Sequence, residues 1–209
     1  MIKRRKLSVF DLYYEDYEKW FERYPEIYEE EIKTVKSLLP PFKKAMEVGI
    51  GTGRFALPLG IDYGIEVSEK MAEIARSKGL RVDIKSAEEM DFEEEFDLIL
   101  MVTTICFVKD SFKTIKNCYK ALKKGGSLLV AFVDLNSPLG KTYEKNKHKS
   151  KFYAPATFFS KDDIINLMKK VGFRGFECKE NLYGESLDNL KFEINDCNGG
   201  AFKVIRGVK

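Results

Sequence analysis

Seven residues near position 50 combine a flexible backbone with an acidic side chain. The segment E-V-G-I-G-T-G runs from Glu47 to Gly53, and its glycines alternate at Gly49, Gly51 and Gly53. Glycine reaches backbone angles closed to other residues, and without a Cβ it lets a ligand lie against the main chain. Such a loop suits a nucleotide-like cofactor, although a tight turn can need glycine for structural reasons alone.

Glu66 adds a second polar group further along the chain. It lies in the run I-E-V, at the end of a segment typical of a β-strand and thirteen positions after Gly53. A carboxylate at that place can accept hydrogen bonds from both hydroxyls of a ribose. The alternative is an acid favoured by the dipole of the helix that follows. Its position relative to the glycine loop favours ribose binding.

Alternating β and α signals position these residues. Strands are predicted at 44–48, 63–67, 81–85, 96–102, 127–134, 173–180 and 201–206. Helices are predicted at 54–59, 68–78, 111–123 and 160–171, the third of them stopped by Gly125-Gly126. This order predicts an α/β fold with a doubly wound, Rossmann-like, mostly parallel seven-stranded sheet. Ligands of such folds bind beyond the carboxyl ends of the strands.

The flanking segments complete a single expected domain over residues 1–209. The stretch 7–39 is rich in aromatic residues and Glu and predicts one or two amphipathic helices, ended by Pro40-Pro41. Residues 42–135 form the expected core, and 136–209 the remaining strands and an insertion. The connection 134–159 is long, and connections of that length are often functional covers.

Composition excludes several classes of function. Hydrophobic residues make up 44% and the net charge is +3, a globular balance with no general field for nucleic acid. No apolar run is long enough to span a membrane, and no secretory leader is recognisable. The four cysteines lack a C-x-x-C pair, so we expect reduced thiols in a cytoplasmic protein and no metal site.

Taken in order, the motifs resemble those of class I S-adenosylmethionine-dependent methyltransferases. E-V-G-I-G-T-G-R-F resembles their first motif, G-I-E-V-S-E-K-M the second, and S-A-E-E-M-D-F is similar to the third-strand motif. F-D-L-I-L-M-V-T-T-I-C-F-V resembles the fourth strand, and A-L-K-K-G-G-S-L-L-V the helix, turn and fifth strand after it. The resemblance extends from about Tyr17 to Arg206. It is closest to the small-molecule group that includes ubiquinone and menaquinone biosynthesis methyltransferases.

The resemblance implies S-adenosylmethionine as cofactor and a small molecule as methyl acceptor. The glycines would pass the methionine portion, Glu47 would orient its ammonium group, and Glu66 would hold the ribose hydroxyls. Val67 would pack against adenine, and Ser86 lies near the Asp that many relatives carry at the adenine edge. The implied cofactor-binding residues are Tyr17, Glu47, Gly49, Gly51, Gly53, Glu66, Val67, Ser86, Ala87, Glu88 and Met101.

Relatives also use an N-terminal helix as a lid, which places a lid here within residues 1–41. Their Y-x-x-W-F pattern matches Y-E-K-W-F at Tyr17 to Phe21, whose aromatic faces suit a sulfonium, although an ordinary core helix would look the same. Small polar residues after the fourth strand suit a cleft floor or a simple strand cap. The predicted substrate-pocket residues are Trp20, Phe21, Tyr28, Thr103, Thr104, Tyr143, Phe152 and Tyr153.

Other functions stay open at this point. A nicotinamide dehydrogenase usually carries G-x-G-x-x-G, which differs from the spacing here. The basic stretch 3–6 and the lysine run 141–151 suit methylation of RNA or protein. The absence of an N-P-P-Y-like string argues against DNA amino-methylation. No catalytic base is identifiable, so a non-catalytic cofactor-binding subunit is a further alternative. We expect a monomer or homodimer.

Overall fold

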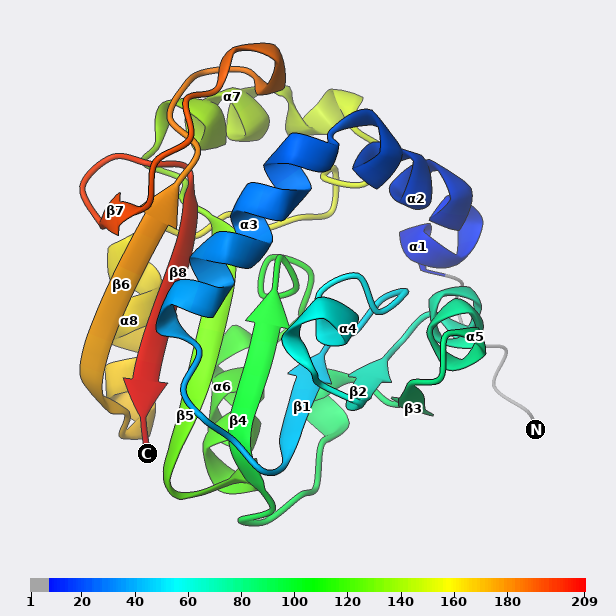
Figure 1. Ribbon diagram of the computed structural model, residues 1–209, viewed down its shortest axis with the longest axis vertical. Coiled ribbons are helices and arrows are strands. Elements are labelled where there is room, and N and C mark those ends of the chain that lie inside the picture. Colours follow the sequence, from blue (N-terminus) through cyan, green and yellow to red (C-terminus); the bar gives the residue numbers. More distant parts are fainter. Residues whose placement is uncertain (1–7) are drawn as a thin grey trace.

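A mixed sheet of eight strands, in the order β3-β2-β1-β4-β5-β8-β6-β7, forms the centre of the computed structural model, which describes residues 8–209 (Figure 1). The basic stretch 3–6 lies outside the described residues. The strands are β1 (Ala45–Val48), β2 (Tyr63–Glu66), β3 (Arg81–Ile84), β4 (Phe96–Val102), β5 (Leu122–Val133), β6 (Arg174–Asn181), β7 (Asn195–Asp196) and β8 (Phe202–Val208). Strands β1 to β5 pair in parallel, and β8 is antiparallel to β5 and β6.

The predicted α/β, doubly wound fold is therefore confirmed, and the strand count is one higher. The additional strand, β7, has two residues and pairs with β6. The chain leaves β1 for β2 and β3 on one side and returns to β4 on the other, so the order reverses between β1 and β4. At such a reversal the crossovers diverge and leave room for a ligand beyond the strand ends.

Eight α-helices surround the sheet over the described residues. They are α1 (Val9–Leu12), α2 (Tyr14–Arg23), α3 (Pro25–Leu38), α4 (Ala56–Leu59), α5 (Glu69–Ser77), α6 (Ser111–Ala121), α7 (Pro138–Asn146) and α8 (Lys161–Val171). Short 3-10 turns are η1 (Ala87–Glu89), η2 (Lys147–Lys149) and η3 (Leu187–Asn189). The predicted caps Ser68 and Ser160 are confirmed, the latter with Asp163 in a capping box. Within 8–209, no helix has the length and apolarity needed to cross a membrane.

Two boundaries differ from the prediction. The N-terminal region forms three helices, because the chain breaks at Tyr13 and Tyr24. Helix α6 ends at Ala121, and the glycines predicted to stop it lie within β5. Between the pairs Phe96–Leu122 and Leu98–Ser127 the register shifts, so β5 carries extra residues there as a bulge. Gly125, with φ +80°, supplies the conformation that this bulge needs.

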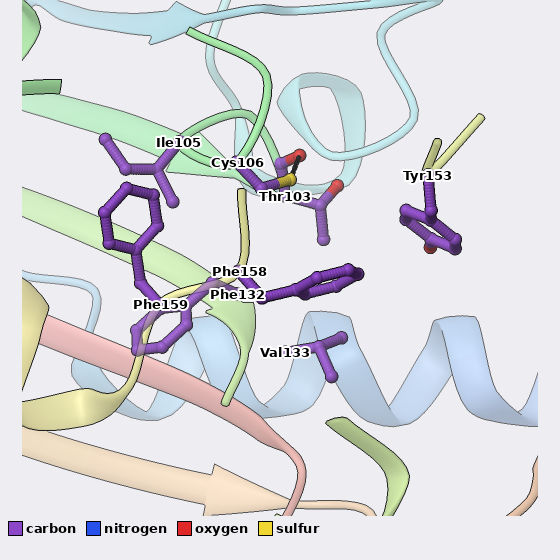
Figure 2. Close-up of a pocket in the computed structure, with 8 residues that line it drawn as sticks. All are labelled: Thr103, Ile105, Cys106, Phe132, Val133, Tyr153, Phe158 and Phe159. Carbon is purple, nitrogen blue, oxygen red and sulfur yellow. Dashed lines mark hydrogen bonds between the residues drawn. The ribbon is translucent and has the colours of Figure 1, made fainter. Parts of the chain in front are cut away.

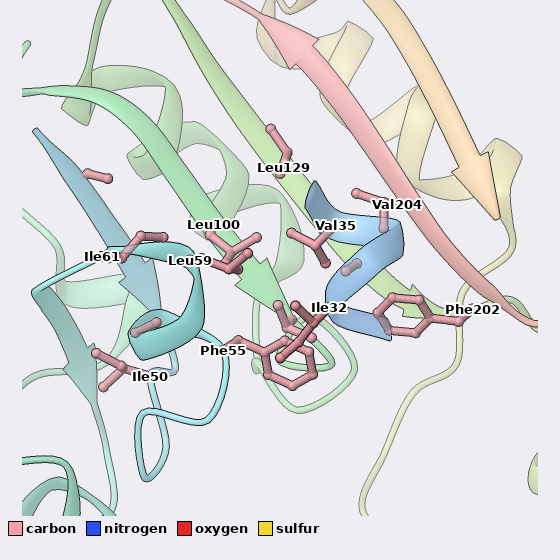
Figure 3. Packing of buried hydrophobic residues seen from close by; sticks show 14 of the residues in the cluster. Ile32, Val35, Ile50, Phe55, Leu59, Ile61, Leu100, Leu129, Phe202 and Val204 are labelled. Atoms are coloured by element: carbon pink, nitrogen blue, oxygen red, sulfur yellow. The ribbon is translucent and has the colours of Figure 1, made fainter. Parts of the chain in front are cut away.

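Both faces of the sheet are covered, which explains the apolar strand sequences. Along β4, Leu98 and Leu100 pack toward α3 and α4, whereas Ile99 and Met101 pack toward α6 and α8. Figure 3 shows Leu100 on the first of these faces, near side chains of α3 and α4. Because alternate residues of a strand point to opposite faces, a strand covered on both sides needs apolar residues throughout.

The carboxyl ends of the parallel strands lie beneath helices from two distant parts of the chain. Figure 1 shows α1 and α2, and separately α7, beyond the upper ends of the strands. We call α1 and α2 (Val9–Arg23) the lid and residues 134–159 the cover. The cover is partly helical, since it contains α7 and η2. A small cavity lies at the ends of β4 and β5 (Figure 2).

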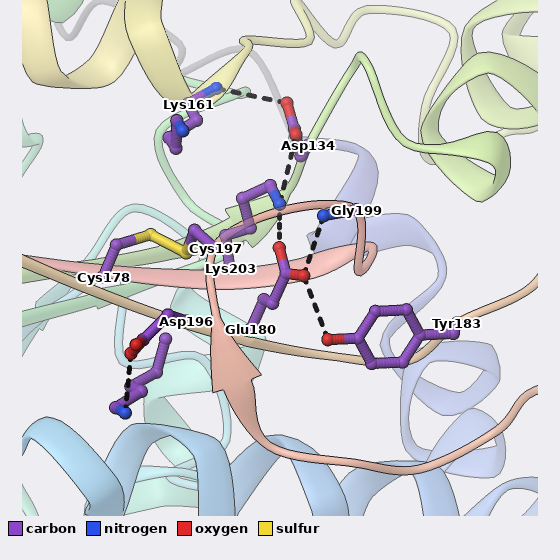
Figure 4. Close-up of a disulfide and its surroundings, with 10 residues drawn as sticks. Asp134, Lys161, Cys178, Glu180, Tyr183, Asp196, Cys197, Gly199 and Lys203 are labelled. Carbon is purple, nitrogen blue, oxygen red and sulfur yellow. Dashed lines mark hydrogen bonds and ion pairs between the residues drawn. A yellow bond between two sulfur atoms is a disulfide. The ribbon is translucent and has the colours of Figure 1, made fainter.

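The expectation of four reduced cysteines is wrong for two of them. Cys178 in β6 and Cys197 just after β7 form a disulfide with a Cα–Cα distance of 5.6 Å (Figure 4). Cys106 and Cys118 are free. The sequence separation of 19 residues carries no recognisable disulfide pattern. It is the antiparallel pairing of Lys179 with Asp196 that places the two flanking cysteines side by side.

Candidate functional site

The glycine loop needs its glycines for backbone and packing reasons together. Gly49, Gly51 and Gly53 have φ values of +71°, +55° and +82°, a region that other residues rarely adopt. A Cβ on Gly49 would lie 2.5 Å from side-chain atoms of Thr104, so the loop passes close to the end of β4. The loop is held against β2, because the Gly49 N–H donates to the Ile65 carbonyl at 2.9 Å.

The Glu66 carboxylate joins the glycine loop to the start of α5. Its Oε2 accepts from the Gly51 N–H at 2.9 Å, and its Oε1 accepts from the Val67 and Ser68 N–H groups at 2.7 and 2.8 Å. Burial raises the pKa of Glu66, while these three hydrogen bonds act to lower it. The helix N-terminus alternative is thus partly correct. An ionised carboxylate has about four acceptor positions, so capacity for a ligand hydroxyl is left.

Glu47, near the end of β1, has one carboxylate oxygen without a donor among residues 8–209. Its side chain is 2% exposed, and within the described part of the chain its Oε2 has no hydrogen-bond partner. Burial raises its pKa well above the ordinary value, a hydrogen bond from the Ala56 backbone lowers it, and the charge of Glu66 raises it. A buried, unsatisfied carboxylate oxygen is costly unless a cation or donor reaches it. The ammonium of a bound amino acid group fits this oxygen.

The lid is tied to the glycine loop and to α5 by polar contacts. Asp11 Oδ1 accepts from Ser68 Oγ at 2.6 Å. Glu18 accepts from the Thr52 hydroxyl and pairs with Arg54 at 2.5 Å. These contacts place the lid over the loop rather than beside it.

Tyr17 occupies the middle of this covered region. Its hydroxyl oxygen lies 3.4 Å from the position of a Cβ on Gly51. Burial raises the pKa of Tyr17, and the charges of Glu47 and Glu66 raise it further. The predicted cofactor residues on the lid, the loop and the end of β2 therefore come together.

The residues predicted to border adenine differ in their exposure and in the groups that their side chains contact. Val67 is 38% exposed at the end of β2, and Ser86 donates through Oγ to Glu89 at 3.0 Å. Glu88 Oε1 accepts from the Lys109 and Asp110 N–H groups, so the carboxylate is turned toward the loop after β4.

Two further adenine-edge and cofactor predictions fall on core side chains. Ala87 is 6% exposed, and the Met101 side chain is fully buried. Both belong to the core on the α6 and α8 side of the sheet. The Met101 side chain is therefore not on the surface of the cleft.

The cavity at the ends of β4 and β5 encloses about 10 Å³, room for about one water molecule. Figure 2 shows its walls, which combine aromatic side chains with two small polar ones. The lining residues are Thr103, Ile105, Cys106, Phe132, Val133, Tyr153, Phe158 and Phe159. Thr103 has φ +48°, a strained conformation for a threonine and one that recurs at functional sites. Burial raises the pKa of the Cys106 thiol to about 12, so it is protonated at neutral pH.

The predicted aromatic pocket divides between this cavity, the core and the lid. Tyr143 stacks on Tyr153 with ring centroids 5.2 Å apart, beside the cavity. Phe152 instead packs on Phe10 of the lid at 5.7 Å. It is a contact between cover and lid.

Three other predicted pocket residues pack among lid and core. Phe21 is buried, and it contacts Trp20 and Tyr28 with centroids 5.1 and 5.0 Å apart. The Tyr28 hydroxyl donates to the Arg54 carbonyl, so it too holds the glycine loop. Thr104 Oγ1 donates to the Val102 carbonyl at 3.0 Å, which is the strand-cap role left open for it.

Sequence reasoning missed two acidic residues beside the candidate site. Asp11 and Glu18 tie the lid down, and their role depends on contacts across the fold that no local pattern reveals.

Comparison with known proteins decides the family. Residues 46–130 match the family model described as a methyltransferase domain. A crystal structure from Thermotoga maritima, described as an S-adenosylmethionine-dependent methyltransferase and possible histamine N-methyltransferase, is 46% identical with a TM-score of 0.92. The match covers 96% of this chain and 98% of that one. This chain belongs to the S-adenosylmethionine-dependent methyltransferases.

Two curated proteins are also similar to this chain. The methyltransferase is 38% identical to an uncharacterized protein of Methanocaldococcus jannaschii, over 97% of this chain and 100% of that protein. It is 29% identical to a ubiquinone biosynthesis O-methyltransferase of Pelagibacter ubique, over 78% of this chain and 71% of that enzyme. The resemblance seen in the motifs is confirmed, and S-adenosylmethionine is the cofactor of the enzyme.

Proposed function

We propose that the enzyme transfers a methyl group to a small molecule enclosed between the strand ends, the lid and the cover. The observation that carries this proposal is the closure of the site. Lid contacts from Asp11 and Glu18 lie over the cofactor side, and Tyr153 and Phe158 wall the acceptor side. A polymer such as RNA needs an open groove along its backbone, which these contacts obstruct.

The proposed residue roles follow from the contacts. When bound, S-adenosylmethionine supplies a sulfonium methyl group that an acceptor can attack directly. Glu47 Oε2, which has no partner among the described residues, would receive the ammonium group, and Glu66 would receive the ribose hydroxyls at the acceptor positions that its backbone contacts leave open. The aromatic rings of lid and cover would exclude water and hold the acceptor in line. Such positioning supplies most of the rate enhancement in a reaction of this kind.

The remaining expectations accompany this proposal. We propose a single-domain, cytoplasmic enzyme that acts as a monomer or homodimer. Disulfides persist mainly in oxidising compartments but are also common inside heat-adapted cells, so the Cys178–Cys197 disulfide is compatible with a cytoplasmic enzyme of such a cell.

A cofactor-product release assay tests the proposed acceptor class. The purified enzyme is given S-adenosylmethionine with a panel of small metabolites, and in parallel with total RNA and a protein extract; heat-treated enzyme is the control. We expect S-adenosylhomocysteine release with at least one small molecule and none with the polymers. Turnover of RNA alone, together with strongly salt-dependent RNA binding, would contradict the proposal.

Loosening the lid should accelerate cofactor release. In Glu18→Gln the ion pair with Arg54 is lost, and both partners are partly buried. A pair of this kind contributes up to about 1 kcal/mol, so we expect dissociation of S-adenosylhomocysteine to become about fivefold faster. Stopped-flow tryptophan fluorescence, with Trp20 in the lid, measures the rate. Glu22→Gln, an exposed residue on the same helix, is the matched control. Identical rates in all three proteins would show that the lid is not a gate.

A further inference from the structure

The Cys178–Cys197 disulfide fixes the start of a turn that wraps a buried carboxylate. The turn consists of residues 198–200, and its backbone N–H groups donate to the side chain of Glu180. The bond from the Gly199 N–H to Glu180 Oε1 measures 2.8 Å (Figure 4). Because Glu180 is completely buried, its carboxylate depends on donors of this kind. The disulfide thus lies directly beside a group that the fold must keep satisfied.

The strand that precedes the turn is weakly attached to the sheet. Strand β7 has two residues, Asn195 and Asp196, which pair with Glu180 and Lys179 of β6. The side chains of Lys179 and Asp196 also form an ion pair, but it lies at the surface, where such pairs contribute little. A strand of this length has little stability of its own. The covalent link to Cys178 therefore holds this side of the turn in place.

The other end of the turn is bonded to the cover. The carbonyl of Ala201, the residue after the turn, accepts from the Asp134 N–H at 2.8 Å, and Asp134 is the first residue of the cover. Two residues further on, Lys203 pairs with Glu180 and lies 3.5 Å from Asp134 Oδ2. These three side chains are at most 8% exposed. A backbone hydrogen bond and a buried ion-pair network therefore connect the turn with the cover.

Asp134 in turn holds both ends of the cover. Its Oδ1 accepts from the Asn136 N–H at 3.2 Å and from the Lys161 N–H, just beyond the cover, at 3.1 Å. Between these two positions, Tyr153 and Phe158 of the cover line the cavity at the ends of β4 and β5. The contacts that begin at the disulfide thus end at the walls of this cavity.

The disulfide is placed where a small thiol can reach it. Cys178 and Cys197 are each half-buried, whereas the free Cys118 is buried in the core. Exchange between a thiol and a disulfide requires that a thiolate approach one of the two sulfur atoms. Partial exposure meets this requirement.

We propose that the Cys178–Cys197 disulfide is a site of thiol–disulfide exchange and that its reduction by a dithiol loosens the cover. The closed bond ties both ends of the segment 179–196 together, which restricts its open conformations. After reduction, the turn separates from Glu180 more often, and the network that positions Asp134 loses donors. The inference goes beyond the proposed function, since it concerns the order of the cover and not the identity of the acceptor.

The exchange balances in atoms and electrons. A thiolate of the dithiol attacks one sulfur of the disulfide, the sulfur–sulfur bond breaks, and its electron pair stays on the sulfur of the other cysteine. The second thiolate of the reductant then attacks the mixed disulfide. The reductant leaves as a disulfide, and the protein has gained two electrons and two protons as two thiols.

Hydrogen–deuterium exchange of the full chain, followed by mass spectrometry, tests this inference. The samples are oxidised wild type, wild type reduced with dithiothreitol, and the double variant Cys178→Ser/Cys197→Ser. On reduction we expect amide exchange at residues 198–203 and in the cover to become at least about tenfold faster, while β1 and β4 stay unchanged. The double variant should match reduced wild type. Alkylation and intact mass establish whether the bond has opened.

Two controls separate the disulfide from other effects. Dithiothreitol added to the double variant should change nothing, because the reagent is present and its target bond is absent. Asp134→Asn keeps the shape of the side chain but loses the pairing with Lys203. Its cover should exchange faster even in the oxidised protein, and reduction should add less than in wild type.

The outcomes are distinct. A disulfide that stays closed in dithiothreitol while the protein is folded would overturn the exchange site. An opened disulfide with unchanged amide exchange in the cover would overturn the link between the two. Reduced wild type gives this answer even if the double variant fails to fold, and no methyl acceptor is needed, so the result is independent of the proposed function.

Discussion

Replacing Glu66 with glutamine should weaken S-adenosylmethionine binding about 10- to 150-fold, or about 1.5–3 kcal/mol, the scale of hydrogen bonds to a charged group. The amide cannot accept with both of its terminal atoms. One of the two groups that meet at Glu66, the ribose or the Gly51 and Ser68 amides, must therefore go unsatisfied. Isothermal titration calorimetry with wild type and Glu66→Gln measures the difference.

The matched control for this prediction is Glu73→Gln, an exposed acid on the helix that follows β2. It should bind the cofactor as the wild type does. Circular dichroism must show that Glu66→Gln keeps its fold, since Glu66 also supports the glycine loop. Equal affinity in all three folded proteins would remove Glu66 from the cofactor site.

Replacing Lys203 with methionine should destabilise the fold by about 3–5 kcal/mol, the cost of leaving a buried charge without its partner. Figure 4 shows Lys203 between Glu180 and Asp134. The Lys203 side chain is 3% exposed, and that of Glu180 is 1% exposed. Without the ammonium, the carboxylate keeps the Tyr183 hydroxyl and the Gly199 N–H as donors but has no countercharge. Chemical denaturation at pH 7 measures the loss.

The same ion pair predicts acid sensitivity. Burial would raise the pKa of Glu180, but Lys203 and the nearby backbone N–H groups lower it to about 2. A lowered pKa stabilises the fold above the unfolded value near 4.5, and the stabilisation is lost as pH falls toward 2. Lys203→Met should lose most of this pH dependence.

Lys179→Met is the control for Lys203, because Lys179 pairs with Asp196 at the surface, where the Asp196 side chain is 91% exposed. Surface pairs contribute about 0–1 kcal/mol, so its stability should stay close to that of the wild type. Equal losses of unfolding free energy in both lysine variants would show that burial of Lys203 does not increase the cost of losing its ion pair. The network also concerns the site, since Asp134 accepts from the Lys161 N–H and so fixes both ends of the cover.

The sequence predicts the central fold well because its signals are local and repeated. The predicted strand 96–102 has the same bounds as β4, whose apolar residues face the helices on both sides of the sheet. Ser68 and Ser160 mark helix starts through hydrogen bonds within their own first turns. Helix α6 and the start of β5 were misjudged, because the register shift after Leu122 depends on pairing with β4. The Cys178–Cys197 disulfide was missed for the same reason.

In the candidate site, too, residues marked by local sequence motifs were predicted, whereas residues that act through long-range contacts were not. The glycine loop and Glu66 come together as predicted because motif spacing fixes them relative to β1 and β2, and their binding of the cofactor stays a prediction. Met101 was assigned by strand position alone, and the alternation of β4 turns its side chain into the core. The contacts of Glu18 with Thr52 and Arg54 arise from packing of the lid against the glycine loop. Such contacts can be identified only once the three-dimensional fold is known.

A crystal structure of the enzyme with S-adenosylhomocysteine tests the central claim most directly. That claim is that the loop from Glu47 to Gly53 and the Glu66 carboxylate together hold the cofactor. We predict the ammonium group within hydrogen-bond distance of Glu47 Oε2, which has no hydrogen-bond partner among the residues that the structure describes, and the ribose hydroxyls on Glu66. A product molecule bound elsewhere, with Glu66 still engaged solely by the Gly51, Val67 and Ser68 amides, would contradict it.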